Sequence, residues 1–205
     1  MAFDRSIGSL PTMTDKCPYG ANRIRLLSAC QAFEGDPVNG NVTVTIREAR
    51  ADDARLLHEA LLALARHTGD EHKIESTPED LLQYGFGPNP AFEALIAEVD
   101  GRFAGMCLSF SSFSTWRGKP GIYVQDLYVD DAFRGRRIGE RLLQAAASRG
   151  YARGARHLRL SVDRANVSAQ AFYERVGIQH CRDEQIHMIR GEQFEAFAQR
   201  ATGGE

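Results

Sequence analysis

The segment Val129–Leu143 has the composition of an anion-binding site, because two glycines and three arginines lead directly into a helical pattern. The first backbone N–H groups of a helix have no intrahelical acceptor, and the helix dipole adds partial positive charge at the same end. Gly135 and Gly139 carry no side chain where a diphosphate would approach the backbone. Arginine guanidinium groups add charge that suits further phosphate groups. The segment therefore predicts a phosphate site at a helix start, although a solvated turn could have the same composition.

The spacing of this loop excludes two other phosphate motifs. No Gly-Lys-Ser/Thr follows the glycines, as a Walker loop requires, and the Gly-x-Gly-x-x-Gly of a dinucleotide fingerprint is absent. The loop follows Ile122–Val129, a segment rich in β-branched and aromatic residues that predicts a strand. Its position between a strand and a helix favours a ligand site over a simple turn.

Two segments together resemble the GNAT acetyltransferases. Arg134–Gly139 is similar to the acetyl-CoA loop of that family, Arg/Gln-x-x-Gly-x-Gly/Ala. Arg137 replaces the usual middle glycine, and we expect the backbone there to be helical and to offer only its N–H. Asn166–Gly177 resembles the family block Asn-x-x-Ala-x-x-Phe-Tyr-x-x-x-Gly. The chain is identified as a member of the family by the two blocks together.

A narrower resemblance is to the spermidine/spermine and thialysine acetyltransferase branch. It rests on Asp80–Gly87 and Trp116–Lys119, with Asp126 in the strand before the loop. The similarity extends from about Val44 to Ala198, and the first forty residues have no counterpart in it.

The resemblance implies acetyl-CoA as cosubstrate. Its pantetheine would pair like an extra strand with the backbone of the predicted strand, where an N–H near Leu127 would bind the oxyanion. Its pyrophosphate would lie on the N–H groups of the loop, and the helix after it would contact the pantetheine and thiol end. The expected cofactor contacts are Leu127, Tyr128, Val129, Arg134, Gly135, Arg136, Arg137, Ile138, Gly139, Glu140, Asn166, Ala169 and Phe172.

The same resemblance makes Tyr173 the candidate general acid. A phenol with a pKa of about 10 can transfer a proton to a departing alkyl thiolate. From the residues alone, a tyrosine that only packs on a short helix is the competing interpretation.

The base is Asp126, or solvent. Relatives in this branch place a Glu-Asp pair in the strand, whereas this chain has Gln125-Asp126, and a glutamine cannot accept the proton. Asp126 could act through water, or substrate deprotonation could be left to solvent. A structural role for Asp126 also remains open.

A cationic amine acceptor favours carboxylates and an aromatic wall. The candidates are Trp116, Gln125, Asp126, Glu71 and Glu184, although each could be an ordinary surface residue. Polyamine enzymes of the branch carry an acidic residue two positions before the tryptophan, where this chain has Ser114. Together with Gln125, this residue leaves the chain without two negative charges that the polyamine enzymes carry. The acceptor is therefore expected to be a small monoamine, diamine or amino-acid-like amine and not a long polycation.

The branch also tends to form homodimers, with C-terminal strands that contribute to the partner's site. We therefore expect a homodimer. Acetylation of protein N-termini or lysines, and a non-catalytic acyl-CoA-binding regulator, are the alternative functions.

Periodic patterns place these residues on strands and helices. Apolar and polar residues alternate over 42–47, which predicts a strand with one buried face. Leu57, Leu61 and Leu64 recur at helical spacing, and Asp100-Gly101 predicts a hairpin turn. The expected elements are strands at 42–47, 91–99, 103–113, 122–129, 158–162 and 185–190, and helices capped by Asp52 or Asp53 and by Thr77, at 138–151, at 168–176 and from Glu192.

This order of elements predicts an α/β fold, and the resemblance implies the GNAT fold, a single mixed, mostly antiparallel sheet with helices on both faces. We expect residues 1–40 to form a loosely structured N-terminal extension, with a short helix around Arg23–Ala32, and residues 41–200 to form the GNAT domain.

The composition is that of an ordinary soluble protein of 205 residues, with 43% apolar residues, 25% charged residues and a net charge of -2. The small charge gives no reason to expect nucleic-acid binding. No apolar run is long enough for a membrane span, and no signal-like apolar core is present near the start. The four cysteines are scattered and the histidines lack ligand spacing, so we expect a cytoplasmic protein without a metal.

Overall fold

The computed structural model describes residues 42–200. The short helix expected around Arg23–Ala32, and the rest of the expected extension, lie outside the described residues.

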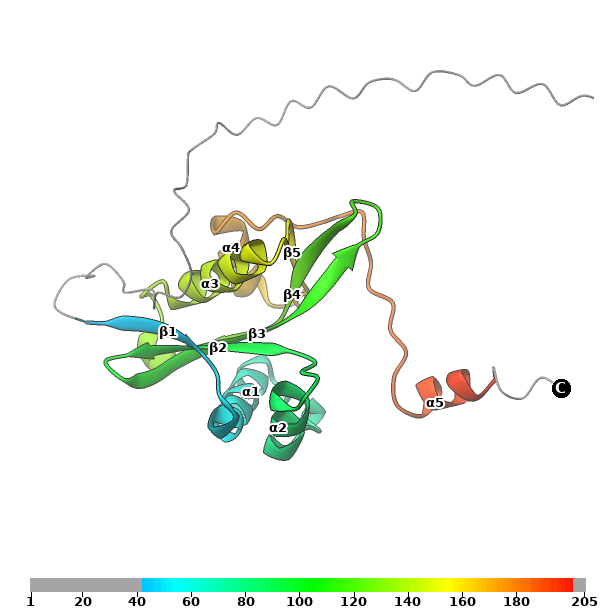
Figure 1. Ribbon diagram of the computed structural model, residues 1–205, viewed down its shortest axis with the longest axis horizontal. Helices are drawn as coiled ribbons and strands as arrows, with labels where there is room; N and C mark the ends of the chain where they lie inside the picture. Colours follow the sequence, from blue (N-terminus) through cyan, green and yellow to red (C-terminus); the bar gives the residue numbers. More distant parts are fainter. Residues whose placement is uncertain (1–41, 201–205) are drawn as a thin grey trace, which may run out of the picture. The chain divides into compact units, whose positions relative to one another are not determined.

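A single five-stranded sheet forms the centre of the domain, in the order β1-β2-β3-β4-β5 (Figure 1). Its strands are β1 (Val44–Glu48), β2 (Glu93–Val99), β3 (Arg102–Ser114), β4 (Lys119–Val129) and β5 (Leu158–Leu160). The first four pair antiparallel, and β5 pairs parallel to β4. The mixed, mostly antiparallel sheet is therefore confirmed.

The turn between β2 and β3 has the conformation that its two residues favour. Asp100 has φ 49° and Gly101 has φ 74°, so both lie in the left-handed region. The Asp100 carboxylate accepts a hydrogen bond of 3.0 Å from the Thr43 backbone N–H, which ties the turn to the chain before β1. The predicted hairpin is confirmed.

Helices cover both faces of the sheet, as the fold class requires (Figure 1). Helices α1 (Ala54–Thr68) and α2 (Pro78–Phe86) pack against one face, where Leu57, Ile96 and Met106 are fully buried. Helix α3 (Ile138–Ala152) packs against the other face. The two apolar clusters share the sheet as their common wall. Helix α4 (Val167–Arg175) adds Phe172 and Tyr173 to the α3 side.

Helix α3 is fixed by the apolar stripe that the sequence predicts. Ile138, Leu142 and Ala146 are buried on one face, with Leu143 beside them. Burial of one leucine side chain stabilises the fold by about 1.5–3 kcal/mol. The first residue of this helix belongs to the core, so the helix start is held close to the end of β4.

The two predicted helix starts differ in how they form. Thr77 caps α2 through a capping box with Asp80, and Pro78 occupies the first turn, as predicted. Asp53 precedes α1 but makes no side-chain cap. Its carboxylate instead accepts two hydrogen bonds from Arg47, at 2.7 and 2.9 Å, which join the start of α1 to β1.

The C-terminal segment departs from the prediction. Helix α5 (Glu192–Gln199) forms as expected, but residues 185–190 form no strand. All residues from 179 to 200 are exposed, and none of the described strands pairs with this segment. A strand needs a neighbour for its backbone hydrogen bonds, so alternation of apolar and polar residues was insufficient by itself to form one here. None of the helices in the described range is long and apolar enough to cross a membrane.

Candidate active site

An extra residue in β4 separates that strand from β5. In the pairing of β3 with β4, Ser109 faces Val124 and Leu108 faces Asp126, so Gln125 is the unpaired residue of a bulge. The pairing of β4 with β5 also ends at Val124. Residues 125–129 of β4 therefore continue with no strand on their second edge within the described chain.

This free edge carries the backbone of Leu127, Tyr128 and Val129. Unpaired N–H and C=O groups on a sheet edge can bind an extended ligand as an added strand. The side chains of Leu127 and Val129 pack on the α3 side, and that of Tyr128 packs on the α1 side. The edge suits an extended pantetheine, whose pairing with these residues stays a prediction.

The start of α3 leaves several backbone N–H groups without acceptors. The first intrahelical bond runs from Arg141 N–H to Arg137 C=O, at 3.0 Å, and no side chain caps the helix. The N–H groups of Ile138, Gly139 and Glu140 therefore have no acceptor among the described residues. Gly135 has φ 77°, a conformation that glycine adopts without a steric penalty. This arrangement suits a diphosphate.

Arg137 corrects one expectation. Its backbone is left-handed, with φ 58° and ψ 19°, and not helical as expected. The family's glycine at this position is explained by that conformation, which costs a residue with a Cβ roughly 1–2 kcal/mol. The guanidinium makes two hydrogen bonds of 2.9 Å with Glu140, which offset part of this cost.

Gly139 has a role in packing that the sequence did not indicate. It is buried, and an added Cβ would lie 3.3 Å from Phe172 Cζ and 3.5 Å from Val129 Cγ2. The missing side chain lets α3 approach α4 and the end of β4 closely. Phe172 is thus placed beside the helix start, in contact with Tyr173 at a ring-centroid distance of 5.3 Å.

Asn166 and Ala169 are joined to each other at the start of α4. The Asn166 side-chain oxygen accepts a hydrogen bond of 3.0 Å from the Ala169 backbone N–H and another of 3.0 Å from the Ser168 hydroxyl. Asn166 is therefore the N-cap of α4. A contact of either residue with a cofactor stays a prediction.

The pKa values of Asp126, Cys107 and Tyr173 are all raised, and burial is the largest cause for each. Burial raises the pKa of the Asp126 carboxyl to about 6, and no described group donates a hydrogen bond to it. Burial first, and the charge of Asp126 second, raise the pKa of the Cys107 thiol to about 12. Burial also raises the pKa of Tyr173, with smaller effects of Cys107 and Asp126.

The acid and base candidates approach from different faces of the sheet. Strand alternation after the bulge puts Asp126 on the same face as Tyr128, towards α1. Tyr173 packs on the α3 face with Leu127. A carboxylate on one face and a phenol on the other can serve the entering and leaving groups of one substitution.

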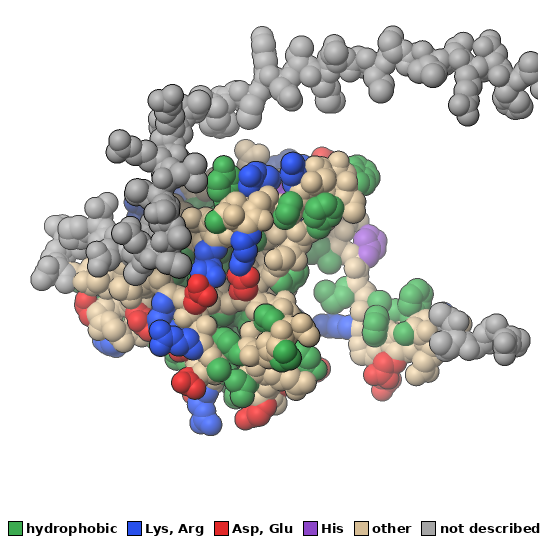
Figure 2. Space-filling view, viewed as in Figure 1, with side chains coloured by type: hydrophobic (Ala, Val, Ile, Leu, Met, Phe, Trp, Pro, Cys, Tyr) green, Lys and Arg blue, Asp and Glu red, His purple; other side chains and the backbone are tan. Residues whose placement is uncertain are grey.

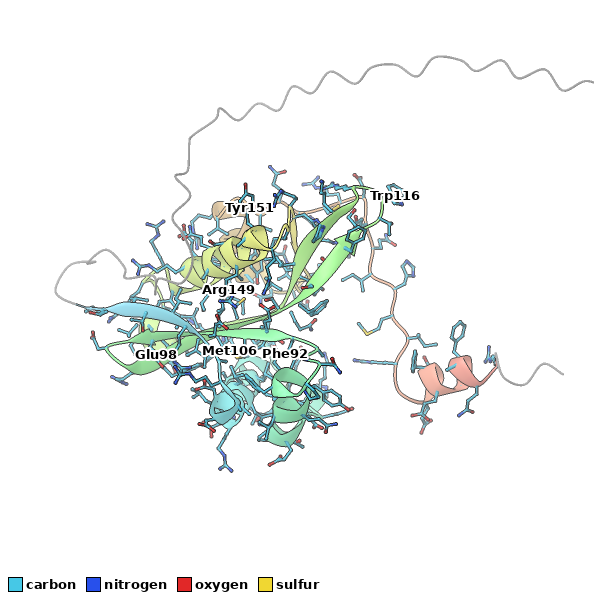
Figure 3. All side chains as sticks on the ribbon, viewed as in Figure 1. Phe92, Glu98, Met106, Trp116, Arg149 and Tyr151 are labelled. Carbon is cyan, nitrogen blue, oxygen red and sulfur yellow. The ribbon has the colours of Figure 1, made fainter. Side chains whose placement is uncertain are left out.

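The remaining substrate candidates differ in their surroundings. Gln125 is exposed at the bulge, whereas Trp116 is 99% exposed at the tip of the β3–β4 hairpin (Figure 3). Glu71 pairs with Arg66 at 3.4 Å, and Glu184 pairs with Arg159 of β5. Gln125 therefore adjoins Asp126 at the bulge, and the two glutamates are each paired with an arginine.

Two residues of the site were missed by sequence reasoning. Cys107 is fully buried in the apolar cluster against which Tyr173 packs, and only its place in the predicted strand 103–113 could have indicated this. Phe133 supports the loop from the core, and its lone aromatic ring in a polar loop was the available signal. Over residues 42–200, no cluster of three or more potential metal ligands occurs.

The sequence of this chain resembles those of known proteins. The sequence model of the family described as acetyltransferase (GNAT) family matches residues 54–178. Thialysine N-epsilon-acetyltransferase of Bos taurus is 32% identical over 171 residues, which cover 79% of this chain and 98% of that protein. Spermidine/spermine N(1)-acetyltransferase-like protein 1 of Homo sapiens is 34% identical over 106 residues, 48% of this chain and 15% of that protein. The resemblance to this branch is confirmed.

Solved structures agree on the fold. An aminoglycoside acetyltransferase from an uncultured soil metagenomic sample, solved with sisomicin, superposes with a TM-score of 0.60 at 16% identity. The match covers 72% of this chain and 95% of that one. At this identity the likeness concerns the fold alone, and it supports the predicted class.

Replacement of Asp126 should show the cost of its burial. Its folded pKa of about 6 lies above the unfolded value of about 3.9, so the folded state holds a proton more tightly and loses stability as pH rises from about 4 to 6. The free energy of unfolding of Asp126→Asn should therefore be about 2–3 kcal/mol larger than that of the wild type at pH 7.5. The two free energies should be equal near pH 4. Urea denaturation across this range measures the difference.

Asp52→Asn, at an exposed carboxylate before α1, is the matched control. A pH-independent difference for Asp126→Asn would contradict the burial argument.

Proposed function

We propose that this chain, which belongs to the GNAT acetyltransferase family, transfers an acetyl group to the primary amine of a small molecule by direct attack in a ternary complex. As a member of this family the chain is an N-acetyltransferase, and its family uses acetyl-CoA as cosubstrate. The observation that carries the proposal is the free edge of β4, which has half-buried Asp126 at one end and the uncapped start of α3 at the other.

The residues present fit acetyl-CoA in two independent respects. The edge of β4 offers unpaired backbone groups to the extended pantetheine, and the N–H groups from Gly135 to Glu140 suit its diphosphate. When bound there, acetyl-CoA supplies the acetyl thioester. A backbone N–H near Leu127, on the same edge, would bind the carbonyl oxygen as its negative charge grows.

Asp126 is the proposed base. Because burial raises the pKa of its carboxyl to about 6, the group is ionised at neutral pH and still more basic than an exposed aspartate. It would take the proton of the acceptor ammonium, directly or through one water. Gln125, next to it on the bulge, contributes no base and can only accept or donate a hydrogen bond.

Tyr173 is the proposed acid. Burial raises the pKa of its phenol, so the proton is held at neutral pH and is available for the departing thiolate. Its position on the α3 face, across the sheet from Asp126, keeps proton removal and proton delivery apart.

The chemistry near Cys107 favours direct attack over a covalent route. An acyl-cysteine intermediate would need a thiolate, and burial raises the pKa of this thiol to about 12. The thiol therefore stays protonated at neutral pH. Attack by the amine itself needs no such nucleophile.

The acceptor is proposed to be a small primary amine, in the class of diamines, polyamines or amino-acid-like amines. The bulge presents one half-buried carboxylate and a neutral Gln125, and Ser114 stands where polyamine enzymes of this branch carry an acidic residue. One carboxylate suits one ammonium group better than a chain of them. The similarity to a thialysine N-epsilon-acetyltransferase supports an amino-acid-like amine.

Thiol release from acetyl-CoA, measured against a panel of amines, tests this function. We expect turnover with short diamines or basic amino acids and weaker turnover with spermine. Activity confined to peptides would transfer the assignment to protein acetylation. Binding of acetyl-CoA without turnover on any amine or peptide would contradict the proposal and favour an acyl-CoA-binding regulator.

Tyr173→Phe should reduce kcat by about 10²–10⁴, because it removes the general acid but not the ring. The melting temperature should change little, since the phenol makes no hydrogen bond within the described chain. Tyr84→Phe, at an exposed tyrosine of α2, is the matched control and should retain full activity. A near-normal kcat for Tyr173→Phe would exclude Tyr173 from the mechanism.

We propose further that the chain forms a homodimer through its C-terminal segment. Ile186 and Met188 alternate with polar residues and are 70% and 74% exposed, and Phe194 and Phe197 of α5 are also exposed. Figure 2 shows hydrophobic side chains uncovered along this segment. One edge of β5 pairs with β4, and its other edge has no strand in the described chain. An exposed apolar segment with strand alternation is a suitable partner for such an edge in a second copy.

Sedimentation analysis should give the mass of a dimer for the wild type. Ile186→Asp should shift the protein towards monomer, because a charge would be buried in the interface. Leu82→Asp, at an exposed leucine of α2, should leave the dimer intact. A monomeric wild type, or an unchanged dimer with Ile186→Asp, would contradict this arrangement.

A further inference from the structure

The three arginines of the loop after β4 differ in their partners. Arg134 pairs with Asp131 at 2.6 Å, and Arg137 pairs with Glu140 at 2.9 Å. Arg136 has no carboxylate partner among the described residues. Its guanidinium instead lies over the ring of Phe133, 5.7 Å from the centroid.

A second arginine lies on the same ring. Arg102, the first residue of β3, places its guanidinium 5.5 Å from the Phe133 centroid, and it too has no carboxylate partner in the described chain. Both distances are within the range of about 6 Å in which a cation interacts favourably with an aromatic ring. Segments that are about thirty residues apart in the sequence thus place two cations without a carboxylate partner over one aromatic ring.

Phe133 fixes these cations in place. Only 7% of this residue is exposed, and it packs in the same apolar cluster as Ile138, the first residue of α3. The ring therefore belongs to the core, and the two guanidinium groups lie at its surface. Arg136 lies two residues before Ile138, at the helix start whose N–H groups have no acceptors in the described chain.

Two like charges at one ring repel each other, and an anion between them would relieve that repulsion. A guanidinium stacked on a ring keeps its N–H edge free, and its fork of donors matches the oxygens of a phosphate. The N–H groups of the helix start suit one phosphate group or diphosphate, so the arginine pair is suited to another.

We propose that Arg102 and Arg136, seated on Phe133, form a subsite for a phosphate monoester next to the helix start. This inference rests on the proposed function for one of two sources of the ligand. Acetyl-CoA carries a phosphate monoester on its ribose in addition to its diphosphate, and that group would reach the arginine pair. A separate small phosphate anion is the other source.

Calorimetric titration of the full chain with acetyl-CoA and with acetyl-3′-dephospho-CoA tests the subsite. The wild type should bind acetyl-CoA more tightly than the dephospho compound. Arg102→Gln should weaken binding of acetyl-CoA about tenfold and leave the dephospho compound unaffected, because one charge-assisted contact is lost. Arg136→Gln should act in the same way.

Arg156→Gln is the matched control, since this arginine also lies over an aromatic ring, that of Tyr151, but at the other end of α3. It should bind both compounds as the wild type does. Circular dichroism and melting temperature should be unchanged in the Arg102 and Arg136 variants, because both side chains are exposed.

A second experiment, the melting temperature with inorganic phosphate, identifies the source of the phosphate. Inorganic phosphate should raise the melting temperature of the wild type by mass action. If Arg102→Gln removes that effect while binding both thioesters normally, the subsite stands and its ligand is a separate anion. Equal weakening for both thioesters, or no effect on either thioester or on phosphate, would overturn the subsite. A wild type that binds neither thioester would instead refute the proposed function, whatever the arginine variants do.

Discussion

The extra residue at Gln125 is the constraint on which the rest of the site depends. It ends the pairing of β4 with β5 at Val124 and leaves the next residues of β4 with an unpaired edge. It also shifts the alternation, so Asp126 faces α1 while Leu127 faces α3. One inserted residue thereby creates a place for an extended ligand and sets two different environments on either side of it.

In the loop after β4, too, backbone groups contribute more than side-chain charge. Its charge is smaller than its three arginines indicate, because Arg134 and Arg137 are engaged with carboxylates of the same segment. What the loop offers to a phosphate is chiefly the N–H groups of an uncapped helix, held in place by the burial of Ile138. Side-chain charge remains available at Arg136, where an aromatic ring and not a carboxylate supports it.

Two features of the site are unfavourable for folding. A half-buried carboxylate without a hydrogen-bond donor and an arginine in a left-handed conformation each cost stability. The two packed faces of the sheet supply the stability that tolerates these costs. The same burial that makes Asp126 unfavourable for folding raises its basicity, so this destabilisation is linked to the proposed chemistry.

Local patterns in the sequence determined the helices and the Asp100-Gly101 hairpin, because periodicity, turn residues and caps act over a few neighbouring residues. The two family blocks determined the fold class and the acetyltransferase assignment. Tertiary structure alone decided that Arg137 is left-handed, that Gly139 packs against α4 and that Asp126 is half-buried. It also decided that residues 185–190 are not a strand in the single chain. These features depend on contacts between segments far apart in the sequence, and a strand in particular exists only where a neighbour accepts its hydrogen bonds.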